Sequence, residues 1–132
     1  MHRYTVELRI VGEHLDSENV TRTLGIKPTR VARRGHAKIP GSTARWNANM
    51  WGFELLPPGK DDWASLEEAL QALLGIVGPL RDRLQAYSAD NEICLWCGHF
   101  TSSFDGGPTL SPQLLKALAD FGVELTLDTY RQ

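Results

Sequence analysis

The octapeptide ICLWCGHF, residues 93–100, holds both cysteines of the chain, with a histidine two positions after the second. A Cys94-x-x-Cys97 pair followed by His99 has residue types that bind metal ions or form a redox-active disulfide. Both kinds of chemistry require the two sulfur atoms to lie close together. The local structure of this segment therefore decides whether it can do either.

Aliphatic and aromatic residues surround the two cysteines, and no helix-start signal follows them, which predicts a buried β-strand. Strand residues three apart point to opposite faces, and their Cα atoms lie about 10 Å apart, whereas a disulfide needs less than about 7 Å. A structural zinc ion takes four ligands, and the other histidines are isolated in the sequence. We therefore expect structural cysteines, with no metal ion and no other cofactor.

A second group with possible chemistry follows the same strand. Ser102, Ser103 and Asp105 lie just after His99, so a hydrolytic constellation can be imagined. The Asp-Gly-Gly sequence favours a polar turn instead, and no HExxH, GxSxG, Walker or GxGxxG motif occurs. We expect no enzymatic activity, and an unrecognised hydrolase around His99 and Asp105 is the least favoured of three functional hypotheses.

The elements around this strand predict an α+β fold. Alternating apolar residues indicate strands at 4–11 and 123–130, and an extended segment spans 45–56. Helical periodicity and caps predict helices at 17–24, from Asp62 or Ser65 onward with a break at Gly78-Pro79, and after Ser111 as far as Gly122.

The terminal strands are half polar, which argues against a parallel sheet covered on both faces. We expect a single domain over residues 1–132. It is a two-layer sandwich, with a largely antiparallel four- to five-stranded sheet and about three helices on one face. The 93–100 strand should run through the middle of the sheet.

Charge is distributed unevenly along the chain. The formal net charge is −2, but residues 19–53 contain no acid and seven of the 14 lysines and arginines, so a +7 segment adjoins a −9 remainder. Within it, residues 27–50 contain two prolines and two glycines and little periodicity, which predicts a long, mobile excursion with a weak hairpin around Gly35.

This basic excursion is the best functional candidate. The candidate partner- or anion-binding residues are Lys27, Arg30, Arg33, Arg34, His36, Lys38, Arg45, Trp46 and Trp51. Our first hypothesis is a non-enzymatic binding module that meets a protein partner through residues 27–45, one form being an immunity-type protein that blocks a toxin. The second is a nucleic-acid or phosphate-ligand binder that uses the same residues. A solvated loop with both tryptophans in the core is the plainer interpretation, and it stays open.

The polar face of the sheet offers little for nucleic acid. It carries Glu7, Glu124 and Asp128 against Arg9, with Tyr130 as its only expected aromatic, whereas RNA-recognition sheets display several aromatics. The sequence contains neither an apolar run of membrane-spanning length nor a signal-peptide pattern. We expect a cytoplasmic protein without membrane contact that is a monomer or, through exposed edge strands, a homodimer.

Several stretches together resemble a bacterial family named domain of unknown function 4279. They are the opening strand, LDSENVTRTLGIKPT, Gly35, the Trp51 strand, the leucine-rich helix from Leu66, and LSPQLLKALADFGVELTLDTY. The resemblance implies no established activity, cofactor or catalytic residue. The small stand-alone members of that family look like binding or interaction proteins.

Overall fold

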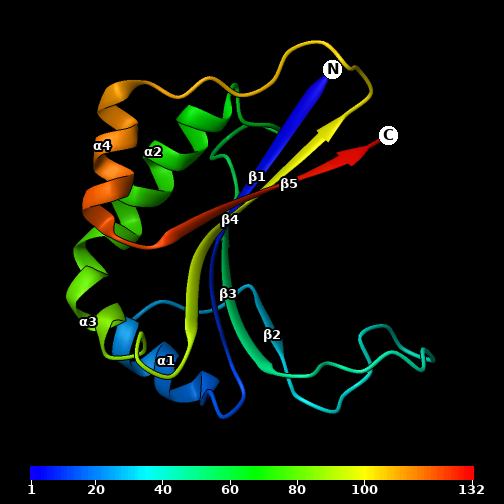
Figure 1. Ribbon diagram of the computed structural model, residues 1–132, viewed down its shortest axis with the longest axis vertical. Helices are drawn as coiled ribbons and strands as arrows, with labels where there is room; N and C mark the ends of the chain where they lie inside the picture. The colour runs from blue at the N-terminus through cyan, green and yellow to red at the C-terminus, as the bar shows by residue number, and fades with distance from the viewer.

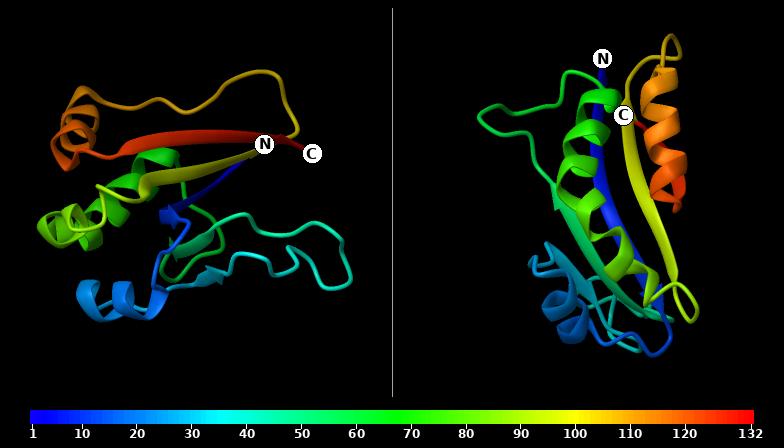
Figure 2. Two further views of the ribbon diagram at one scale, coloured as in Figure 1. Left: turned by 60° about the horizontal axis from the view of Figure 1, so that its bottom comes forward. Right: turned by 90° about the vertical axis from the view of Figure 1, so that its left-hand side faces the viewer.

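A five-stranded sheet with helices on one side organises the chain, and the computed structural model describes all residues 1–132. The strands are β1 (His2–Gly12), β2 (Arg30–Ala32), β3 (Asn49–Leu55), β4 (Glu92–Thr101) and β5 (Glu124–Arg131). The helices are α1 (Ser17–Leu24), α2 (Leu66–Val77), the 3₁₀ turn η1 (Gly78–Leu80), α3 (Arg81–Gln85) and α4 (Pro112–Phe121). Figures 1 and 2 show the helices gathered on one face, which confirms the predicted α+β architecture.

The strands follow the order β2-β3-β1-β4-β5 across the sheet. Neighbouring strands are antiparallel except β4 and β5, which are parallel because α4 carries the chain back along the sheet between them. The sheet is therefore largely antiparallel, as predicted. The central strand is β1, and β4 lies beside it as an interior strand.

The helix ends form where the sequence predicts them. The side chains of Asp16, Ser65 and Ser111 each accept a hydrogen bond from the backbone N–H three residues later. Gly25 and Gly122 end α1 and α4 in the left-handed conformation, at φ +74° and +79°. These local interactions fix both ends of α1 and α4 and the start of α2.

The core fills the space between the sheet and α2. Alternate residues of β1, from Tyr4 to Ile10, point toward the helices and pack against the apolar stripe of α2. Burying each large aliphatic side chain contributes about 1.5–3 kcal/mol, so this one layer supplies most of the apolar stabilisation. No helix of the chain is both long enough and apolar enough to cross a membrane.

The segment between α1 and β3 differs from the prediction. Residues 30–32 form β2, an edge strand paired with β3, and β3 begins only at Asn49 rather than near 45. The short β2 escaped prediction because three residues carry no periodicity, and its pairing with β3 is non-local. We call the intervening residues 33–48 the arm.

The arm is a hairpin, but not the one predicted around Gly35. The backbone N–H of Gly35 donates to the Trp46 carbonyl at 2.8 Å, and that of Trp46 donates to the His36 carbonyl at 3.0 Å. A bridge joins Ala37 to Arg45, and Gly41 lies near the tip at φ +81°. Figures 1 and 2 show the arm extending away from the sheet beyond β2 and β3.

Candidate functional site

The two cysteines point to opposite faces of β4, which confirms that their thiols diverge. Cys97 is wholly buried in the core, whereas Cys94 is half-buried on the face opposite the helices, and both are free. Burial raises the pKa of the Cys97 thiol to about 12, with a smaller contribution from Cys94. Burial is also the main cause of the raised pKa of Cys94. No group of three or more His, Cys, Asp or Glu side chains is placed to hold a metal ion.

The contacts of His99 do not form a catalytic triad. Its Nε2 lies 2.8 Å from Nδ1 of His2, and its ring stacks on Tyr4 at 4.8 Å between centroids. The other nitrogen of His2 lies 2.9 Å from the backbone carbonyl oxygen of Asp105. The hydroxyl of Ser103 bonds only to the backbone of Asp105. None of these contacts joins His99 to a serine hydroxyl or to a carboxylate, so the hydrolase hypothesis lacks its geometry.

The structure divides the nine predicted binding residues among different places. Arg30 lies in β2, outside the arm, and its guanidinium lies 3.2 Å from the Glu7 carboxylate on the sheet. Arg34 forms an ion pair with Glu13 at 2.8 Å. The cations without an ion pair are Lys27, Arg33, Lys38 and Arg45, and each is exposed, as is His36.

The two predicted tryptophans have opposite environments. Trp51 is fully buried under α1, and its indole Nε1 donates a hydrogen bond to the Thr21 hydroxyl at 3.1 Å. A partner cannot reach it, so its assignment as a binding residue was wrong. Trp51 lies two residues before the inward-facing Phe53 on the same strand, so the alternation of the sequence already indicated that both side chains point to one face. Trp46 is half-buried at the base of the arm, where the Lys38 ammonium lies 5.2 Å from its ring centroid.

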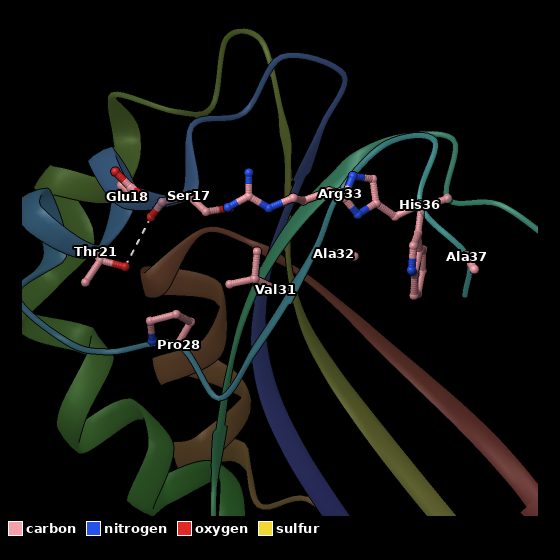
Figure 3. A pocket seen from close by; sticks show the side chains of 10 residues that line it. Ser17, Glu18, Thr21, Pro28, Val31, Ala32, Arg33, His36 and Ala37 are labelled. Carbon is pink, nitrogen blue, oxygen red and sulfur yellow. Dashed lines mark hydrogen bonds between the residues drawn. The ribbon is translucent and has the colours of Figure 1, made fainter. Parts of the chain in front are cut away.

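A cleft of about 450 Å³ lies between the start of α1 and the base of the arm. Figure 3 shows Arg33 extending from the arm base toward Ser17 and Glu18 of α1, with His36 on the arm beside it. An adjoining pocket shares these residues and adds Asp16 and Arg34. The cleft therefore presents carboxylates and guanidiniums together, and an anion entering it meets acids as well as bases.

The arm also carries an exposed apolar side chain. Ile39, near the tip, is 67% exposed and follows Lys38 directly. The arm packs no residue into the buried core cluster. It is thus a hydrogen-bonded hairpin whose outer surface combines unpaired cations with an apolar tip.

The face of the sheet opposite the helices carries more aromatic residues than predicted. Besides Tyr130, alternate residues of β4 place Trp96 and Phe100 on it, so the expectation of a single aromatic was wrong. Arg3 of β1 lies over the Phe100 ring at 4.3 Å, and Arg9 lies over the Trp96 ring at 4.1 Å. The parity of β4 was available in the sequence, but the pairing of β4 with β1 was not.

The carboxylate of Glu7 lies at the centre of this face. It is only 3% exposed, and it accepts hydrogen bonds from Arg9 and Arg30 on either side. Burial, and then the nearby Glu7 charge, raise the pKa of Glu54 on the adjacent strand. We call this layer the open face and define it by the residues Arg3, Glu7, Arg9, Arg30, Trp96, Phe100 and Tyr130.

The fold and these surfaces define a two-layer α+β domain with a cationic hairpin arm and an aromatic sheet face. The chain belongs to the family described as a domain of unknown function (DUF4279), whose family model matches residues 2–132 and confirms the resemblance read from the sequence. Comparison with curated proteins and with solved structures found no match for this chain.

Proposed function

We propose that the protein is a non-enzymatic binding module whose arm engages an acidic surface on a protein partner, as an immunity-type protein engages a toxin. The proposal places the protein in the cytoplasm, where two free thiols such as Cys94 and Cys97 persist. It rests on one observation above all. Three cations without ion pairs, Arg33, Lys38 and Arg45, lie on the arm, which also carries the exposed Ile39.

Charge and shape on the arm suit a protein partner. The exposed cations speed association with an acidic surface, because long-range attraction steers the encounter. Ile39 supplies an apolar anchor at the tip, and Trp46 an aromatic one at the base. A partner that offers an acidic cleft with an apolar floor would satisfy both features.

The hydrogen-bonded structure of the arm supports the same interpretation. Paired backbone hydrogen bonds hold both of its strands, including the bond from the Lys38 N–H to the Ala44 carbonyl at 3.0 Å. A hairpin that is already formed loses little conformational entropy on binding. A pre-formed hairpin supports a binding surface over a solvated loop whose charges serve only solubility.

The alternative is a nucleic-acid or phosphate-ligand binder that uses the same cations. Asp16 and Glu18 weigh against it, because both line the adjoining pocket together with Arg33 and Arg34. Asp16 also already caps the N-terminus of α1, the part of that helix best suited to an anion. The mixed charge of the cleft thus favours a protein surface over a phosphate.

The test compares two charge-altered variants. The arm variant carries Lys38→Glu, Ile39→Asp and Arg45→Glu, and the control carries Lys60→Glu and Lys116→Glu on the helical side. Immobilised wild type should retain a protein from an extract of its source cells, and the arm variant should not. Titration of that purified protein should then show a loss of affinity of at least about tenfold for the arm variant and little change for the control.

Two results would reject the proposal. One is a retained protein that binds the arm variant as tightly as wild type, or no protein that depends on the arm. The other is tight binding of a random single-stranded oligonucleotide that weakens steeply with salt and is lost in the arm variant, which would establish the nucleic-acid alternative.

A further inference from the structure

We propose that the free edge of β5 binds an extended segment of a partner protein in which basic residues alternate with apolar ones. The segment adds to the sheet as a sixth strand. β5 is the last strand of the sheet and pairs with β4 alone. Figure 2 shows it at the end of the sheet away from β2 and the arm. This site is therefore independent of the arm and of the partner proposed for it.

The backbone of this edge has hydrogen-bonding groups that the rest of the chain does not use. The N–H of Gln132, just after β5, donates to the Thr101 carbonyl of β4 at 2.8 Å. Successive residues of a strand direct their N–H and C=O groups to opposite sides, so the odd-numbered residues from Leu125 to Arg131 direct theirs away from β4. None of the backbone hydrogen bonds of the chain reaches these outward groups. They are free to pair with another strand.

The edge also lacks the usual protection. Natural sheets block exposed edges with short strands, proline, lysine or β-bulges. At the opposite edge, β2 has only three residues and leads directly into the arm. β5 has eight residues, contains no proline or lysine, and keeps one uninterrupted register with β4 from Glu124 to Arg131. A long, regular edge of this kind is a template for another strand.

The helical side of this edge is apolar. Leu125 and Leu127 point to the same side of the sheet as Leu95 and Cys97, the buried residues with which they pair. They are nevertheless 37% and 42% exposed, because β5 has no neighbour on its outer side. An added strand covers both leucines, and apolar residues on its helical side would remove apolar surface from water.

The opposite side of this edge is acidic. Glu124 and Asp128 of β5 and Glu92 of β4 point to it, and none of the three forms an ion pair. Asp128 accepts a hydrogen bond from the Tyr130 hydroxyl at 2.7 Å, which leaves its charge uncompensated. Opposite charges on neighbouring strands attract. Because strand side chains alternate between faces, charge complementarity calls for lysine or arginine at every second position of the added segment.

A second copy of the chain fits this edge less well. In an antiparallel pair of β5 strands, a two-fold axis through Asp128 sets the two Asp128 carboxylates opposite each other. An axis through Thr126 sets Glu124 opposite Asp128 of the other copy, and an axis through Leu127 or Thr129 leaves the two Asp128 carboxylates diagonal to each other. Like charges so placed are unfavourable. The carboxylates that attract a basic segment therefore also oppose self-pairing.

Three synthetic heptapeptides with blocked ends test the charge and the alternation. The first alternates lysine with valine and begins and ends with lysine. The second has the same composition in an order that breaks the alternation, and the third has glutamate in place of each lysine. Isothermal titration calorimetry should show that the wild-type chain binds the first peptide at least about tenfold more tightly than either of the others. The double variant Glu124→Lys with Asp128→Lys should prefer the third peptide to the first.

A proline tests whether the added strand pairs through the backbone. Thr129→Pro removes an outward N–H but no hydrogen bond to β4, so the fold should be retained. Binding of the lysine–valine peptide should nevertheless weaken at least about tenfold. Thr129→Ala keeps the N–H and serves as the matched control. Circular dichroism checks that each variant is folded.

Three outcomes would overturn the proposal. The first is a wild-type protein that does not bind the lysine–valine peptide at millimolar concentration. The second is equal binding of the alternating and reordered peptides, or equal binding by wild type and Thr129→Pro, which would show charge attraction without strand addition. The third is a wild-type dimer in sedimentation equilibrium that Thr129→Pro dissociates, which would show that a second copy occupies the edge.

Discussion

His2 and His99 meet at the end of the β1–β4 pair, with Nδ1 of one ring 2.8 Å from Nε2 of the other. A hydrogen bond between two imidazole nitrogens needs one of them to accept, so both rings cannot be fully protonated while the bond exists. His99 is 5% exposed and stacks on Tyr4. Burial, and then the proximity of His2, lower the pKa of His99 below its ordinary value.

Stability should therefore fall in mild acid. The folded pKa of His99 lies below the unfolded one, so the unfolded chain binds more protons between the two values. The free energy of unfolding then decreases as the pH falls from about 6.5 toward the folded pKa, and is fully retained above about 6.5. Thermal melts over this range should show a steeper decline for wild type than for His99→Gln. His14→Gln, at an exposed site, should follow wild type, and parallel wild-type and His99→Gln curves would contradict the assignment.

Trp51 and Thr21 should be energetically coupled. Thr21→Val leaves the buried indole N–H of Trp51 without an acceptor, at a cost of about 1–3 kcal/mol. In a Trp51→Phe background the donor is gone, so the same change should cost about 1 kcal/mol less. Urea unfolding of the four proteins measures both values. Equal costs in the two backgrounds would mean that the hydrogen bond does not contribute to stability.

Cys97 should resist alkylation while the protein is folded. A thiol reacts as its thiolate, and burial raises the pKa of Cys97 to about 12, so almost none is ionised near neutral pH. Iodoacetamide followed by mass spectrometry should modify Cys94 slowly and Cys97 only after urea is added. Rapid labelling of Cys97 in the native protein, or recovery of a Cys94–Cys97 disulfide, would contradict the structural role of this strand.

The parts of the fold that local interactions determine could be predicted from the sequence. Ser65 and Ser111 cap their helices through bonds to residues three positions later, and Gly25 ends α1 by its own conformational freedom. Such signals lie within a few residues of the element they define. The parallel pairing of β5 with β4 depends on chain segments far apart, and no local signal specifies it.

The candidate site was harder to predict for the same reason. The composition of the sequence reveals the cationic segment. It does not reveal that Arg30 lies on the open face beside Glu7, because that position depends on the pairing of β2 with β3. Trp96 and Phe100 were read as parts of an interior strand, and their exposure follows from helices covering only one side of the sheet. Arg3 and Arg9 reach these rings across the β1–β4 pair, a contact that the sequence order conceals.

The four tryptophans lie in three different environments: the arm, the open face and the core. Trp46 belongs to the arm, Trp96 to the open face, and Trp51 and Trp63 to the core. Replacing all but one with phenylalanine yields variants whose ultraviolet emission reports on a single region. The molecule thus contains its own optical reporters, and changes at the arm, on the open face and in the core can be followed separately without an attached dye.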